Sequence, residues 1–447
     1  MKIKIIFLAF ILMLITCGSV LADDMAENEH PFMLVQKSEY EHLRRLAEKS
    51  PWKELKETAI EDAHNLVFNP DKTRNNLQTR SNALSAKISA SALSYILDPG
   101  NKEFYVQNIV DLIAYWDPQN TDGFFDELYS AGNYTWDNTI PPGSAMANTI
   151  IALDIIHDEL TPAQLMTCES AVEQVSEHYW ATYEPHYIGV LGVRCLWAIY
   201  CRNWGRLTTA WKEYKPLYDT YISTNGVGRP GADYTMQRLV VAGRDSRAII
   251  PYVMEYLDLD HDFFDNEVHK QFAEWAMGYP YTPALKKWCF GDTRGYATSA
   301  GEDRASNYMA FAADRFSEQA AKQASWLMKD VQPRGRLFNY LFLKEEFAEP
   351  EPPKSRIFPD GGAYFYENID NPNSIACSMF NLSSEADGHG HKDTNSVSIA
   401  GFGETLTANS GYAGWQKSSG GFSWNYINDS AISANTVLVN YDYGDLK

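Results

Sequence analysis

Apolar residues recur at intervals of three and four along most of the chain, from about residue 38 to residue 343. The interval is clearest in residues 83–96 and 106–113, and further runs cover residues 146–156, 163–180, 191–200, 248–257, 268–277 and 307–328. This spacing gathers apolar side chains on one face of an α-helix. Loops rich in Pro, Gly, Asn and Asp separate the runs, and no repeat of fixed length is visible. Many such helices are compatible with an α/α toroid or a solenoid.

The pattern changes near residue 345. Residues 345–356 are acidic and rich in proline, which is typical of a linker. After them the apolar residues alternate with a period of two, which predicts strands in residues 362–366, 375–380, 396–400 and 434–439. We therefore predict an α+β multidomain chain, with a helical domain in residues 38–344 and an antiparallel β-domain in residues 357–447.

The first 22 residues have the pattern of an export signal. Lys2 and Lys4 give a positive start, residues 5–15 form an apolar run, and residues 19–22 offer small residues for cleavage. We expect a periplasmic or secreted protein without a membrane span. Residues 14–17 are an alternative lipoprotein signal that ends at Cys17, and we favour it less.

Composition narrows the classes of partner. The chain has 38 Lys and Arg residues against 58 Asp and Glu residues, a net charge of −20, which argues against binding to nucleic acid. An acidic polymer remains a candidate partner if the protein has a local basic groove. The 27 Tyr, 21 Phe and 12 Trp residues suit a sugar-binding cleft but suit a large core equally well. We expect the cysteines after Cys17 to be buried free thiols, and the sequence does not predict an oligomeric state.

The most specific motif is the segment 387–396, Asp-Gly-His-Gly-His-Lys-Asp-Thr-Asn-Ser, which contains His389 and His391. It resembles the H-x-H-x-D turn of heparinase II/III-like polysaccharide lyases. Residues 402–406, 409–412 and 435–439 also resemble that family, as do residues 358–362 before the turn. The resemblance implies an incomplete α/α toroid followed by an antiparallel β-sandwich, with a cleft between them. With about 90 residues of β-domain in this sequence, we expect the sandwich to be C-terminally incomplete.

The resemblance also implies a reaction, the β-elimination of a uronate-containing polysaccharide. A base removes the C5 proton of the uronate, and an acid protonates the departing O4 oxygen. In the family, a His on one helix and a Tyr on a later loop do this work. Here His186 precedes an apolar helix, and Tyr234 ends the glycine-rich loop 228–234. We predict Tyr234, His186, His389 and His391 as catalytic residues, although Pro185 stands where the family has Asn.

Other side chains are candidates for holding the sugar. A uronate carboxylate must be neutralised or hydrogen-bonded before it accepts enolate charge. We predict as substrate-binding residues Arg238, Gln237, Asn148, Tyr426 and Trp136. Sequence alone leaves Asn138 and Arg244 as further candidates for the carboxylate. Trp116, Tyr134 and Trp136 either stack on sugar rings or pack between helices, and the sequence does not separate these two interpretations.

Several members of the family hold zinc, with a His of the turn, an Asp and a later His as ligands. His391 matches the first position, but Asn409 and Ala434 occupy the other two. An amide and a methyl group do not replace a carboxylate and an imidazole on zinc, so we expect no metal and no other cofactor.

Two other functions stay open. An α/α-toroid glycoside hydrolase or an unsaturated-uronyl hydrolase needs paired carboxylates, and Asp126, Glu127 and Asp233 are available. A non-catalytic glycan-binding protein is the third alternative.

Overall fold

The fold is given by a computed structural model. It describes residues 29–130, 136–181, 187–229, 235, 239–240, 249–291, 293, 304–382 and 394–407.

The first half of the helical part contains most of the long helices. The first nine are α2 (Tyr40–Leu46), α3 (Trp52–Asn65), α4 (Leu77–Leu97), α5 (Lys102–Ile113), α6 (Phe125–Ser130), α7 (Trp136–Ile156), α8 (Pro162–Ala181), α9 (Tyr187–Tyr200) and α10 (Trp204–Thr220). The predicted runs up to residue 200 all lie within helices. Asn76 and Asn203 cap α4 and α10, because each side chain accepts a hydrogen bond from a backbone N–H in the first turn.

The second half of the helical part is built from shorter pieces. They are α12 (Ile250–Tyr256), α13 (Asp262–Asp265), α14 (Glu267–Gly278), α16 (Tyr308–Phe311), α17 (Glu318–Met328) and α18 (Leu337–Phe342). The run 307–328 is not one helix. Ser317 has an extended backbone and caps the N–H of Ala320, so a new helix starts there despite the continuous apolar pattern.

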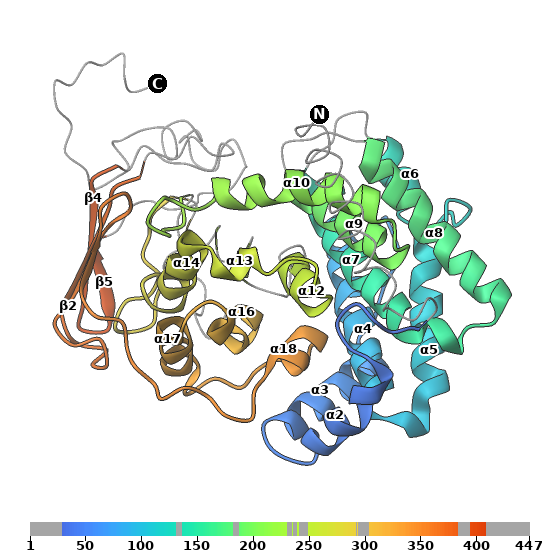
Figure 1. The fold of residues 1–447 in the computed structure, drawn as a ribbon, viewed down its shortest axis with the longest axis horizontal. Helices are drawn as coiled ribbons and strands as arrows, with labels where there is room; N and C mark the ends of the chain where they lie inside the picture. The colour runs from blue at the N-terminus through green and yellow to red at the C-terminus, as the bar shows by residue number, and fades with distance from the viewer. Residues whose placement is uncertain are drawn as a thin grey trace, which may run out of the picture.

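The helices run round in a ring whose last helix returns to the first ones (Figure 1). The hydroxyl of Tyr340 in α18 donates to the backbone oxygen of Leu43 in α2 (2.6 Å). Arg336 forms an ion pair with Asp62 in α3. These contacts join segments that are more than 270 positions apart in the sequence. The toroid that the family resemblance implies is therefore confirmed.

A sheet of five antiparallel strands follows, in the order β1-β2-β3-β4-β5. The strands are β1 (Arg356–Phe358), β2 (Gly362–Tyr366), β3 (Ala376–Phe380), β4 (Ser396–Gly401) and β5 (Glu404–Thr407). The strands predicted between residues 362 and 400 are confirmed to within one residue. One face of the sheet packs on the toroid, and Ile357, Phe365 and Met379 are exposed on the other. The strand predicted in residues 434–439, and with it the second layer of a sandwich, lies outside the described residues.

The sheet lies beside α14 and α17, at the opposite end of the molecule from α5 and α8 (Figure 1). The contacts between the sheet and these helices include a hydrogen bond and a pair of stacked rings. The indole N–H of Trp275 in α14 donates to the hydroxyl of Tyr364 in β2 (3.0 Å). The rings of Phe290 and Phe380 stack with centroids 5.1 Å apart. The linker also packs on the helices, because the N–H of Glu351 donates to the oxygen of Lys322 in α17.

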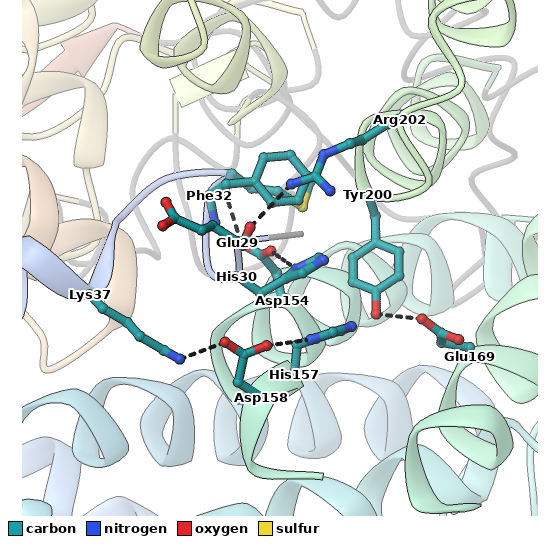
Figure 2. Close-up of polar contacts among 11 residues, drawn as sticks. Glu29, His30, Phe32, Lys37, Asp154, His157, Asp158, Glu169, Tyr200 and Arg202 are labelled. Atoms are coloured by element: carbon teal, nitrogen blue, oxygen red, sulfur yellow. Dashed lines mark hydrogen bonds and ion pairs between the residues drawn. The ribbon is translucent and has the colours of Figure 1, made fainter. Parts of the chain in front are cut away.

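The segment that follows the predicted export signal, residues 29–36, is bound to the ends of α7 and α9 (Figure 2). Its Phe32, Met33, Leu34 and Val35 side chains are buried. The carboxylate of Asp154 in α7 accepts hydrogen bonds from the backbone N–H groups of Phe32 and Met33. We call residues 29–36 the N-terminal strap.

In the described part of the chain, none of the helices combines the length and the apolar character that a bilayer crossing requires. The five cysteines at positions 168, 195, 201, 289 and 377 are free thiols, as expected from their spacing. Cys168, Cys195 and Cys289 are buried as expected, whereas Cys377 is half-buried and Cys201 is exposed. Cys201 follows the last turn of α9 at the surface.

Candidate functional site

Four consecutive helices, α7 to α10, lie side by side in the first half of the toroid. Short connections join them, so each helix runs antiparallel to the one before. The hydroxyl of Tyr200, at the end of α9, accordingly donates to Glu169 in the first half of α8 (2.9 Å). The start of α7, the start of α9 and the end of α10 therefore share one end of the toroid. Trp136 opens α7, and His186 is the residue before α9 in the sequence.

A tight hairpin follows α10 at this end of the toroid. Residues 222 and 228 form an antiparallel bridge, and the N–H of Arg229 donates to the oxygen of Tyr221 (2.9 Å). We call residues 221–229 the first hairpin. The chain then leads to Tyr234, and the next residue, Thr235, is buried against Gly228, where a Cβ would meet its hydroxyl oxygen at 2.5 Å. The residue after Tyr234 in the sequence therefore contacts the first hairpin at Gly228.

The first hairpin is bonded to the turn between β1 and β2. The hydroxyl of Thr224 donates to the carboxylate of Asp360, and the N–H of Asp360 donates to the side-chain oxygen of Asn225 (2.7 Å for the second). Gly361 packs so closely on Val227 that a Cβ would lie 2.3 Å from its Cγ2. Glycine at position 361 is therefore required by the close approach of the two domains.

The same end of the sheet carries the loop with the histidine motif. Phe358 pairs with Gly362, Gly362 with Phe380, and Phe380 with Ser396, which makes one row across four strands. The β1–β2 turn and the β3–β4 connection therefore leave the sheet at the same end. The hydroxyl of Thr394 donates to the oxygen of Leu382 (3.3 Å), so the two ends of the connection that contains His389 and His391 are joined.

Most of the predicted site residues lie outside the described residues: Tyr234, His186, His389, His391, Gln237, Arg238 and Tyr426. For Trp136 only the backbone is described. Asn148 is buried in α7, and its amide donates to Ser85 in α4 (2.7 Å). This bond ties two toroid helices together, and a role of Asn148 in binding substrate stays a prediction.

Trp116 packs between helices, which decides one of the alternatives that the sequence left open. The side chain is fully buried, its ring lies 4.8 Å from that of Phe124, and its N–H donates to Thr149 in α7 (3.1 Å). Stacking of Trp116 on a sugar ring is therefore wrong for this conformation.

The carboxylate of Glu127, a candidate catalytic group for the hydrolase alternative, is paired with cationic side chains. It forms an ion pair with the buried guanidinium of Arg80, and the ammonium of Lys72 lies 3.7 Å away. The guanidinium also lies over the ring of Phe124, 5.1 Å from its centroid. A glycosidase acid or base needs a carboxyl group that reaches substrate and exchanges a proton. This cluster favours a structural role for Glu127.

Burial keeps the other reactive groups near the sheet junction in their neutral forms. It raises the pKa of the Cys289 thiol to about 11 and raises the pKa of Tyr364 well above its usual value. Neither group is ionised near neutral pH, so neither supplies a thiolate or a phenolate. Neither group is therefore a candidate for proton transfer.

The sequence analysis missed Thr224, Asn225 and Asp360 as parts of the site. One signal was available, because Asn225-Gly226 is a dipeptide typical of a hairpin turn. The contact of this turn with Asp360 joins positions 135 apart and has no local signal.

The donor set does not fit the zinc site that the resemblance implies. The second and third ligand positions are Asn409 and Ala434, which lie outside the described residues, and neither side chain is a zinc ligand of the required kind. Among the residues that the structure describes, no group of three His, Cys, Asp or Glu side chains is placed to hold a metal ion. We derive no chemical step through a metal.

The ring of helices with an antiparallel sheet at its end places the chain in the class of α/α-toroid proteins with a β-domain. No protein-family model matches the sequence, and no curated protein matches it. Among solved structures, a heparinase III matches with a TM-score of 0.50 and 11% identity, over 90% of this chain and 62% of its own. The heparan sulfate lyase HepC from Pedobacter heparinus matches with a TM-score of 0.48 and 13% identity, over 85% of this chain and 62% of its own.

The chain therefore has the fold of heparinase III and spans about 62% of the length of that structure. The resemblance first noticed in the histidine motif is confirmed at the level of the fold.

Proposed function

We propose that this protein is a polysaccharide lyase that cleaves a uronate-containing acidic polysaccharide by β-elimination. Tyr234 and His186 are its proton-transfer groups, and His389 and His391 bind or orient the uronate from the sheet. This proposal joins the chemistry of the motif residues to a fold that heparinase III also has.

One observation supports the proposal most strongly. The row Phe358, Gly362, Phe380 and Ser396 brings the β1–β2 turn and the β3–β4 connection to one end of the sheet. The first hairpin, which leads to Tyr234, is bonded to that turn through Asp360. Segments that are distant in the sequence, and that carry a tyrosine and two histidines, thus start from one junction. A β-elimination needs such groups around a single sugar.

The reaction needs no external nucleophile and no redox partner. A base at the junction takes the C5 proton of the uronate, and the electron pair of the C5–H bond forms the C4–C5 double bond. The C4–O4 bond then breaks, and the leaving O4 oxygen receives a proton from the tyrosine hydroxyl. The candidates to neutralise the uronate carboxylate, which accepts enolate charge in the transition state, are Asn138, Asn148, Gln237, Arg238 and Arg244. The net change is one sugar–oxygen bond lost and one double bond gained.

We also propose that the protein acts outside the cytoplasm, because its first 22 residues have the pattern of an export signal. Because the net charge is −20, the protein as a whole repels an acidic polymer. We therefore propose that a local basic surface binds the substrate.

The substitution Tyr234→Phe tests the mechanism, because it removes one hydroxyl and almost no volume. We expect turnover to fall by about 10² to 10⁴-fold, the usual range for loss of a general acid or base. KM and the melting temperature should stay close to those of the wild type, because the hydroxyl acts mainly in the transition state. Full activity in Tyr234→Phe would contradict the assignment of Tyr234.

A further inference from the structure

The helical domain contains two hairpins with the same backbone geometry. The first hairpin is bridged between residues 222 and 228, and a second, residues 280–288, is bridged between residues 281 and 287, each position shifted by 59 (222 to 281, 228 to 287). In both, the N–H of the third residue donates to the oxygen of the seventh, at 2.8 Å from Ser223 and 2.7 Å from Thr282. The sixth residue is left-handed in both, with φ of 80° at Gly226 and 55° at Leu285.

Each hairpin follows a helix and contacts the sheet, but the two contacts lie at opposite ends of the strands. The first hairpin meets the β1–β2 turn through Asp360, beside the start of β2. The second meets the other end, where the hydroxyl of Tyr366 donates to the oxygen of Tyr281 (3.3 Å) and Lys286 forms an ion pair with Glu404. Tyr366 pairs with Ala376 at the end away from Phe380.

Because the two hairpins contact opposite ends of the strands, we assign a different role to each contact. The second hairpin fastens the sheet to the toroid at the end remote from the β3–β4 connection. The first hairpin makes its contact at the end where that connection leaves the sheet, and its exit strand leads to Tyr234 within six residues of Gly228.

We propose that Asp360 is a positioning residue, which holds the first hairpin against the sheet and so fixes the start of the segment that leads to Tyr234. This inference rests on the proposed function. The carboxylate of Asp360 accepts the hydroxyl of Thr224, and its N–H binds the side chain of Asn225, so one turn residue fixes two consecutive hairpin residues. Misplacement of a reacting group by about 1 Å is enough to lower turnover strongly, even when substrate still binds.

The variants that test this proposal are Asp360→Ala, Asp360→Asn and Glu404→Ala in the full-length chain. Asp360→Ala removes the acceptor, whereas Asp360→Asn keeps a side-chain oxygen for the hydroxyl of Thr224. Glu404→Ala is the matched control, because it removes a bond between the toroid and the sheet at the opposite end. The steady-state rates are measured on a uronate polysaccharide that the wild type cleaves.

We expect Asp360→Ala to lower kcat about tenfold or more with little change in KM, the pattern of a displaced catalytic group. Asp360→Asn should recover most of the rate, and Glu404→Ala should keep it. An Asp360→Ala variant with the kcat of the wild type overturns the proposal. Equal loss of kcat in Asp360→Ala and Glu404→Ala also overturns it, because the effect would then belong to the interface as a whole.

Hydrogen–deuterium exchange separates this inference from the lyase assignment. We expect Asp360→Ala to speed exchange in peptides covering residues 221–240, with Glu404→Ala leaving these peptides unchanged. Unchanged exchange in Asp360→Ala contradicts the positioning role whatever the activity. Absence of unsaturated product from the wild type contradicts the proposed function, and the exchange result then decides whether Asp360 still fixes the hairpin.

Discussion

The Nδ1 atom of His30 lies 2.7 Å from an Oδ1 atom of Asp154, and both side chains are more than nine-tenths buried (Figure 2). The other carboxylate oxygen accepts the backbone N–H groups of Phe32 and Met33, at 3.1 and 3.0 Å. One carboxylate in α7 therefore receives three hydrogen bonds from the N-terminal strap. The ring of His30 also stacks on His157, with centroids 3.7 Å apart.

The substitution Asp154→Ala should destabilise the protein by about 2–4 kcal/mol, because it leaves buried N–H groups and an imidazole without their acceptor. The matched control is Asp158→Ala. That carboxylate binds Lys37 and His157 but is 37% exposed, so its loss should cost about 1 kcal/mol or less. Urea unfolding of both variants measures the difference, and equal losses would contradict a buried role for Asp154.

Glu159 should make stability depend on pH in the acid range. A hydrogen bond from Lys102 lowers the pKa of Glu159 below its ordinary value of 4.5, burial opposes this shift, and a bond from Tyr95 adds to it. A carboxyl group with a lowered pKa in the folded state stabilises the fold above its unfolded pKa, and this contribution is lost as the pH falls through the folded pKa.

We therefore expect Glu159→Gln to be less stable than the wild type at pH 7, by about 1 kcal/mol or less. The gap between the two proteins should narrow as the pH falls from 5 to 3. Melting curves at several pH values measure it, with Glu103→Gln, an exposed carboxylate in the neighbouring α5, as control. A constant gap between wild type and Glu159→Gln would disprove the linkage.

Gly226 in the first hairpin should not tolerate a side chain. Its φ is 80°, and an added Cβ would lie 2.5 Å from the backbone of Gln271 and Phe272 in α14. Gly226→Ala should cost more than about 1 kcal/mol of stability. Gly205→Ala, near the start of α10 and exposed, should be neutral or stabilise slightly. Similar melting temperatures for the two variants would contradict this account of the hairpin.

Local periodicity predicted the helices and the strands, because apolar spacing is a property that each segment carries by itself. The closure of the helices into a toroid was predicted from the family resemblance, because apolar spacing is compatible with a solenoid as well. The break between α16 and α17 was missed because the residues around Ser317 keep a helical pattern, and one capping side chain outweighs it. The 59-residue hairpin repeat was invisible for a related reason. The two copies share Ser or Thr at the third position and a left-handed sixth residue, but that sixth residue is Gly in one copy and Leu in the other.

The site was less predictable than the fold. Motif residues such as His389 carry a local signal, whereas the contact of Asp360 with Asn225 joins positions 135 apart. Nothing in the local sequence marks this contact, since an isolated Asp has many roles. Trp116 shows the converse problem, because an aromatic residue beside a loop has the same pattern whether it packs or binds a sugar.

Zinc should be present at well below one equivalent in the purified protein, because Asn409 and Ala434 are poor replacements for zinc ligands. Activity should accordingly survive a chelator. The double variant Asn409→Asp with Ala434→His restores both donor types and should raise the zinc content toward one equivalent. Metal analysis of the two proteins measures this, and equimolar zinc in the wild type would refute the prediction.

The central claim is tested most directly by the product that the full-length protein releases from uronate polysaccharides, such as alginate, heparan-type glycans, ulvan and glucuronan. β-Elimination leaves a C4–C5 double bond conjugated to the uronate carboxylate, which absorbs ultraviolet light. We predict that at least one of these polymers yields chain ends with this absorption, and that Tyr234→Phe forms them about 10² to 10⁴ times more slowly. New reducing ends without ultraviolet absorption would show that the protein is a hydrolase. Binding of a polymer without any new chain ends would show that it is a glycan-binding protein. Either result would contradict the lyase assignment.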